Sequence, residues 1–107
     1  MAVIQGELLW QPDAQFKKAS RLQAFIDWLS ARRGLTFKDY GTLWQWSVDD
    51  IDDFWSAIWE FFDVQADGDA STVLGTRDMP GAHWFPNTQL NYAEHAFRNA
   101  SEVSPVF

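Results

Sequence analysis

The sequence contains no cysteine, which excludes a disulfide framework, a thiolate nucleophile and any metal site built on cysteine. No apolar run approaches the roughly 20 residues that a helix needs to cross a bilayer. The first ten residues, MAVIQGELLW, lack a basic segment and a long apolar stretch, so they do not form a signal peptide. We therefore expect a cytoplasmic protein whose glycosylation sequon at Asn99 stays unmodified.

Positive charge is missing from the middle of the chain. Residues 39–69 contain nine Asp and Glu but no Lys or Arg, and the whole chain has a net charge of −7. An acidic centre argues against binding to nucleic acid or to an anionic membrane surface. The carboxylates are best explained as a solvated helix face with capping groups, and a basic partner is the alternative.

Catalytic motifs are also missing. There is no glycine-rich phosphate loop and no GxSxG sequence, and His83 and His95 do not form an HExxH pattern. Arg32 and Arg33 end a predicted helix, which favours a terminus that complements the helix dipole over a phosphate site. We assign no catalytic, cofactor-binding or metal-binding residue to this sequence.

One segment imitates a calcium-binding loop. Asp63, Gln65, Asp67 and Gly68 occupy positions 1, 3, 5 and 6 of such a loop. Its twelfth position requires a bidentate Glu but holds Leu74. The missing ligand leads us to reject a calcium site.

Aromatic residues, by contrast, are abundant. They make up 17% of the 107 residues and include seven Trp, and hydrophobic residues reach 47%. This composition rules out a disordered tail and indicates one domain with a modest core. Most Trp residues fall at core positions of predicted helices, so we expect them to pack internally rather than to line a carbohydrate or peptide groove.

The rest of the predicted fold is arranged around the segment 47–64, SVDDIDDFWSAIWEFFDV. Ser47 is a candidate N-cap, with Asp50 completing a capping box. The apolar residues that follow show helical spacing and cover an arc of about 160°. They are Ile51, Phe54, Trp55, Ile58, Trp59, Phe61 and Phe62. One neighbouring helix can hardly cover so wide a face, so either several elements of this chain or a body outside it must do so.

Further elements are predicted before the segment 47–64. Residues 1–19 form an extended arm that Trp10 anchors to the core, and residues 20–64 form a helical core. In that core one helix runs from the capping box of Ser20 with Gln23 to Gly34, and its buried stripe includes Leu22, Phe25, Ile26 and Leu29. A second helix covers residues 36–46, with Thr36 as its cap; Gly41 weakens its interior and allows a close crossing.

Residues 65–107 form a connector, a loop rich in Pro and Gly, and a last helix. Asp67-Gly68 predicts a turn, and short strands are expected near 73–74 and over 82–85. Asn91 caps the last helix, whose buried stripe comprises Leu90, Ala93, Ala96 and Phe97. The apolar end, Ser-Pro-Val-Phe, looks like the start of a strand. The fold class is therefore mainly α, with about four helices and short strands or extended segments.

The order of motifs resembles the N-terminal region of acetoacetyl-CoA synthetases, and more loosely that of acetyl-CoA and propionyl-CoA synthetases. The resemblance runs from about residue 8 to residue 107. It rests on Trp10-x-Pro12, Phe25-x-x-Trp28, DYGTLWQWSV from Asp39, FWSAIWEFF from Phe54 and MPGAHWFPNTQLNYAEHAF from Met79. Members of the family usually have Asn where this sequence has His95.

The resemblance implies that this chain is the N-terminal part of a larger α/β enzyme of the adenylate-forming superfamily. Such an enzyme activates a carboxylate with ATP and Mg²⁺ and passes the acyl group to CoA. All of the residues that bind these molecules are expected beyond residue 107, so this part alone has no cofactor and no activity. Its partner is then the rest of its own chain, and on its own it is expected to be marginally stable or to self-associate.

Two other functions stay open. The chain is alternatively a stand-alone helical interaction module whose aromatic face takes a partner helix. A small-ligand binder would require a concave aromatic pocket, which a sequence does not reveal. No nucleic-acid or membrane partner is expected.

Overall fold

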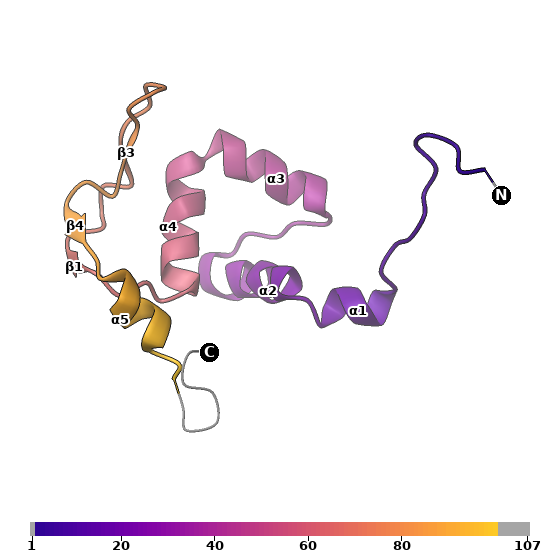
Figure 1. Ribbon diagram of the computed structural model, residues 1–107, viewed down its shortest axis with the longest axis horizontal. Coiled ribbons are helices and arrows are strands. Elements are labelled where there is room, and N and C mark those ends of the chain that lie inside the picture. The colour runs from indigo at the N-terminus through magenta and orange to yellow at the C-terminus, as the bar shows by residue number, and fades with distance from the viewer. Residues whose placement is uncertain (1, 101–107) are drawn as a thin grey trace. The chain divides into compact units, whose positions relative to one another are not determined.

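Five helices and four short strands follow one another in the part of the chain that the computed structural model describes, residues 2–100 (Figure 1). The chain divides into two units, Met1–Phe37 and Lys38–Phe107. This division lies inside the stretch 20–64, which the sequence analysis treats as one helical core. Within the described range, no helix combines the length and apolar character needed to span a membrane.

The first unit contains α1 (Ala14–Lys18) and α2 (Arg21–Arg33). The helix α1 lies in the arm that was predicted to be extended, and it begins where the Asp13 side chain accepts a hydrogen bond from the Phe16 N–H at 2.8 Å. Trp10 is 69% exposed, and its ring packs edge-on against Phe16 with the centroids 6.0 Å apart. The prediction that Trp10 anchors the arm to the core is therefore wrong, because its ring neighbour belongs to the same arm.

The helix α2 has the ends that its sequence predicts. The Ser20 hydroxyl accepts a hydrogen bond from the Gln23 N–H at 3.1 Å, and Gly34 adopts a left-handed conformation with φ of 67°. Its N–H donates to the carbonyls of Leu29 and Ser30. Of the predicted stripe, Phe25 and Leu29 are buried, whereas Leu22 is exposed.

The second unit begins with α3 (Tyr40–Asp49) and α4 (Ile51–Phe61), which meet at an angle (Figure 1). The predicted start at Thr36 is wrong. Asp39 caps α3 by accepting from the Thr42 N–H at 2.8 Å, and the Thr42 hydroxyl accepts in return from the Asp39 N–H. This reciprocal capping box places the N-cap three residues later than predicted.

The predicted cap at Ser47 is also wrong. Ser47 lies inside α3, where its hydroxyl donates to the Trp44 carbonyl at 2.6 Å. The Asp50 N–H still donates to the Trp46 carbonyl at 2.9 Å, so the helix continues past Ser47 and the break falls at Asp50. Asp50 precedes α4 without any side-chain capping hydrogen bond.

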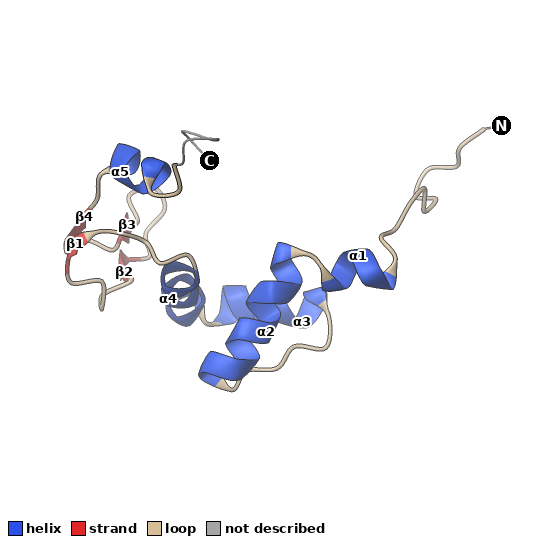
Figure 2. Cartoon of the chain, turned by 90° about the horizontal axis from the view of Figure 1, so that it is seen from below, coloured by secondary structure: helices blue, strands red, loops and turns tan. Residues whose placement is uncertain are grey.

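The strands form two antiparallel pairs on the same side of α4 in both views (Figures 1 and 2). One pair joins β1 (Asp67–Gly68) to β4 (Thr88–Gln89), and the other joins β2 (Leu74–Thr76) to β3 (His83–Trp84). The second pair confirms the strands expected near 73–74 and over 82–85.

The predicted turn at Asp67-Gly68 is instead part of a strand pair. Gly68 has a φ of 104°, and a Cβ atom at this position would lie 2.2 Å from the Asn87 carbonyl oxygen. Glycine is therefore required for the close approach of the two strands rather than for a turn.

The last described element is α5 (Tyr92–Phe97). Its predicted cap is confirmed, because the Asn91 side chain accepts from the Glu94 N–H at 3.2 Å. The predicted buried stripe is wrong: none of its residues is buried, and Leu90, Ala93 and Phe97 are exposed. The strand start predicted at the end of the chain lies outside the described residues.

Candidate docking surface and acidic pocket

The two histidines occupy different elements of the second unit. His83 lies in β3 and is exposed, whereas His95 lies in α5 with its Nδ1 atom buried and without a hydrogen-bond partner. Over residues 2–100, no group of three or more His, Asp or Glu side chains is arranged to hold a metal ion.

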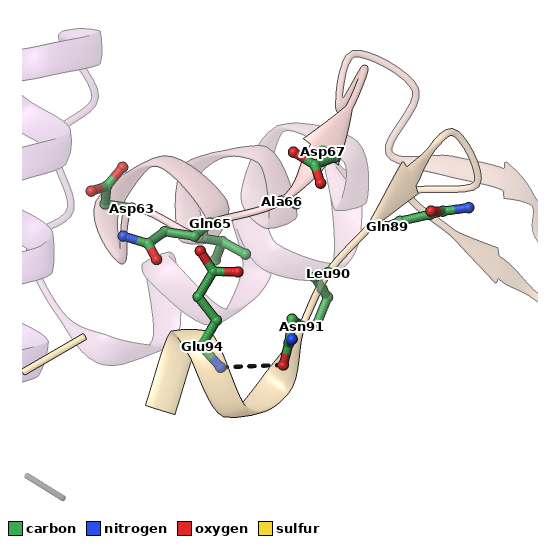
Figure 3. A pocket seen from close by; sticks show the side chains of 9 residues that line it. Asp63, Gln65, Ala66, Asp67, Gln89, Leu90, Asn91 and Glu94 are labelled. Carbon is green, nitrogen blue, oxygen red and sulfur yellow. Dashed lines mark hydrogen bonds between the residues drawn. The ribbon is translucent and has the colours of Figure 1, made fainter. Parts of the chain in front are cut away.

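A pocket of about 600 Å³ lies between the C-terminal end of α4 and the N-terminal end of α5 (Figure 3). Its lining comprises Asp63, Val64, Gln65, Ala66, Asp67, Gln89, Leu90, Asn91 and Glu94. Three of these side chains are carboxylates, and none is a Lys or an Arg. The negative potential of such a lining disfavours phosphate and carboxylate ligands.

Three residues of the rejected calcium loop, Asp63, Gln65 and Asp67, line this pocket. The carboxylates of Asp63 and Asp67 nevertheless lie at opposite sides of it, and the Glu94 side chain extends between them (Figure 3). Calcium needs six to eight oxygen ligands that converge on one point. This pocket does not bring its carboxylates together in that way.

Arg98 joins α5 to the end of α4. Its guanidinium donates hydrogen bonds to the carbonyl oxygens of Phe62 and Asp63, which follow the last turn of α4. A cation at this end also complements the negative end of the helix dipole. No local sequence signal predicts this contact, because 35 residues separate Arg98 from Asp63.

Other elements of the second unit cover parts of the surface of α4. Ala57 is fully buried at 0% exposure. The Trp59 ring lies 4.2 Å from the Phe85 ring, and the Trp55 ring meets the Trp84 ring at 5.6 Å between centroids. The segment around β3 therefore packs against α4 through aromatic contacts.

Part of the apolar surface of α4 nevertheless stays exposed. Trp55 is 40% exposed and Phe62 is 49% exposed, and Trp84 beside Trp55 is 46% exposed. Residues seven positions apart on a helix share one face, and half-buried Ile58 lies between Trp55 and Phe62 on that face. We call Trp55, Ile58, Phe62 and Trp84 the α4 stripe.

The helix α3 has an exposed apolar stripe of its own, formed by Tyr40, Trp44 and Val48 at four-residue spacing. None of the seven tryptophans of the chain is fully buried, and Trp10, Trp44, Trp55 and Trp84 are exposed. The prediction that internal packing accounts for most of them is therefore wrong for these four. The second unit carries more apolar surface than its own elements cover.

Two carboxylates of the described residues have a lowered pKa with a local cause. A hydrogen bond from the Thr42 backbone N–H lowers the pKa of Asp39, and one from the Ser71 N–H lowers the pKa of Asp69. Both groups are exposed and hold a helix start or a turn. Neither is prepared by burial for acid–base chemistry.

The described residues thus form helices and short strands with exposed aromatic stripes and one acidic pocket. Residues 40–96 match the family described as the acetyl-coenzyme A synthetase N-terminus. The chain belongs to this family, which confirms the resemblance inferred from its motifs.

Several relatives share this region. The acetoacetyl-coenzyme A synthetase of Rhizobium meliloti (strain 1021) is 40% identical over 91 residues, which are 84% of this chain and 14% of that protein. The acetoacetyl-CoA synthetase of Macaca fascicularis is 33% identical over 101 residues, which are 91% of this chain and 14% of that protein.

A solved structure of acetoacetyl-CoA synthetase from Streptomyces lividans is 47% identical to this chain and superimposes with a TM-score of 0.79. The match covers 86% of this chain and 14% of that structure. The chain thus spans about one seventh of the length of each of these relatives.

Proposed function

We propose that this chain is the N-terminal domain of an acetoacetyl-CoA synthetase and that its own role is structural. The full enzyme would convert ATP, acetoacetate and CoA to acetoacetyl-CoA, AMP and diphosphate through an acyl-adenylate. The observation that carries this proposal is the likeness to the Streptomyces lividans enzyme, at 47% identity over 86% of the chain.

The chemistry of the described residues supports a structural role. ATP, acetoacetate and CoA are all anionic, whereas Asp63, Asp67 and Glu94 surround the pocket between α4 and α5. The sequence has no glycine-rich loop to hold phosphates, and residues 2–100 contain no group of carboxylates arranged to hold Mg²⁺. These residues do not fit the cofactors, and we therefore place the sites for ATP, Mg²⁺ and CoA in the remainder of the enzyme.

A substrate comparison tests the proposal. The full open reading frame that contains this chain is expressed, and AMP release is measured with ATP, Mg²⁺, CoA and one of acetoacetate, acetate, propionate or butyrate. We expect the highest kcat/KM for acetoacetate. A higher kcat/KM for another acid would reject acetoacetate as the substrate, and failure to activate any of the four would reject the ligase.

The stand-alone interaction module is the second candidate, and the exposed aromatic stripes of α3 and α4 favour it. The reading frame after the codon for Phe107 separates the two candidates. A long coding region with a nucleotide-binding loop supports the ligase, and an immediate stop codon supports the module.

A further inference from the structure

We propose that the α4 stripe is the surface on which the catalytic remainder of the same polypeptide docks. This inference rests on the proposed function and adds to it the face of the domain that makes the contact. Its occupant is the chain beyond residue 107 of the same molecule, rather than a second copy or a separate protein.

The composition of the α4 stripe is typical of a protein interface. Trp55 and Phe62 lie on one face of α4, and Trp84 from β3 contacts Trp55, so two elements far apart in the sequence build one apolar surface. Large aromatic side chains of this kind are enriched at the centres of protein interfaces. The face is apolar rather than acidic, because the carboxylates Asp53 and Glu60 lie on the other side of α4.

The position of Arg98 favours the same polypeptide as the occupant of the α4 stripe. Arg98 binds the carbonyl oxygens of Phe62 and Asp63, so the chain beyond Arg98 continues from a point beside the C-terminal end of the stripe. A segment tethered at this point has a high effective concentration at the stripe, whereas a second copy must arrive from solution. Arg98 thus holds the end of α5 beside Phe62 of the α4 stripe.

The apolar surface of α4 is covered unevenly, because neighbouring positions Trp59 and Phe62 differ in exposure. The Trp59 ring is covered by Phe85 of its own unit, whereas the stripe at Phe62 is not covered to the same extent. A body that completes the burial of α4 would therefore cover the exposed rings of Trp55 and Phe62. The wide apolar arc of this helix is explained if two different neighbours share it.

Photo-crosslinking in the full-length enzyme identifies the occupant. p-Benzoyl-phenylalanine replaces Phe62, and in a second variant it replaces Trp84, so that the test does not depend on one variant folding. The control places the same residue at Tyr92 of α5, which is 82% exposed and outside the stripe. Mixing ¹⁴N- and ¹⁵N-labelled protein separates links within one molecule from links between two.

We expect positions 62 and 84 to crosslink within one molecule to peptides beyond residue 107, in several-fold higher yield than position 92. Links between molecules would overturn the inference in favour of a second copy. Links confined to residues 1–107, the absence of links, or equal yield at position 92 would also overturn it.

The activity of the unmodified enzyme separates this inference from the proposed function. An enzyme that uses acetoacetate but gives no link from the stripe rejects the docking surface and retains the function. An enzyme inactive on acetoacetate that gives the expected links retains the docking surface and rejects the function.

Discussion

The helices α2 and α4 are held in different ways. The helix α2 ends at groups from its own flanks, with Ser20 at its start and Gly34 at its end. The helix α4 follows Asp50, which makes no side-chain capping bond. Arg98 binds the carbonyl oxygens that follow its last turn, and its Trp59 packs on Phe85, so both partners are far along the chain.

This difference indicates where each helix obtains its stability. Capping groups within four residues of a helix end act even when the rest of the chain is unfolded. A helix held by distant aromatic and guanidinium contacts forms only when those elements are in place. We therefore expect α4 to unfold together with the segment 83–98, and α2 to retain more of its helical structure.

The largest expected effect comes from Trp59→Ala. Loss of the ring that packs on Phe85 should lower the free energy of unfolding by about 3 kcal/mol, the lower end of the range for Trp→Ala because Trp59 is only partly buried. Urea unfolding followed by circular dichroism measures it. Trp44→Ala, at an exposed position, is the control and should cost less than about 1 kcal/mol. Equal losses would contradict the dependence of α4 on distant packing.

The next effect separates two glycines. Gly34→Ala forces a left-handed conformation on a residue with a Cβ atom and should cost about 1–2 kcal/mol, since no neighbouring atom would clash with that Cβ. Gly41→Ala lies within α3 and should instead stabilise the chain by up to about 1 kcal/mol. Thermal and urea unfolding of both variants should give shifts of opposite sign.

The residues that precede α2 and α4 should differ in their effect on stability, by a smaller amount than the two glycines. Ser20→Ala removes the acceptor for the Gln23 N–H and should lower the free energy of unfolding by about 1 kcal/mol. Asp50→Ala is the matched substitution before α4 and should change it little, because the Asp50 side chain makes no capping bond. A loss at Asp50 as large as that at Ser20 would show that α4 is also capped locally.

The smallest effect is a pH dependence at α3. The hydrogen bond from Thr42 holds the pKa of Asp39 below its ordinary value of 3.8. The stabilisation is therefore present above the unfolded pKa and is lost as pH falls from 3.8 through the lower folded pKa. Unfolding midpoints measured over this range should fall less in Asp39→Asn, which keeps an acceptor oxygen but does not titrate. Parallel curves for the two proteins would assign the pH dependence to other carboxylates.

The sequence predicted elements whose signals are local and failed where two local signals competed. The ends of α2 and the start of α5 follow from Ser20, Gly34 and Asn91, each of which acts on backbone within a few residues. Both Ser47 and Asp50 are acceptable N-caps, and the sequence does not say which one a helix uses. The helix that Asp39 and Thr42 begin runs through Ser47, and the break then falls at Asp50.

Gly41 also shows that a local sequence signal does not determine tertiary packing. Its position inside a helix suggested a close crossing, but the one atom that a Cβ would approach is the Asp39 carboxylate oxygen at 3.5 Å, which belongs to the cap of the same helix. The prediction of a crossing is therefore wrong. Spacing along a sequence does not show which face of a helix another element will meet.

The candidate surface was predicted only in part. The wide aromatic arc of α4 follows from helical periodicity, and so does the expectation that one neighbour does not cover it. Contacts with Phe85 and Trp84 decide which aromatic residues of α4 stay exposed. The contact of Arg98 decides where the end of α5 lies.

The amino-acid sequence by itself determined the family, the apolar excess, the lack of catalytic motifs and the caps of α2. These properties depend on residue type and on spacings of a few residues. Only the tertiary structure decided that Trp59 is covered while Phe62 stays exposed, and that Arg98 closes the end of α4. Such contacts join residues 26 to 36 positions apart, and no local spacing rule determines which of them form.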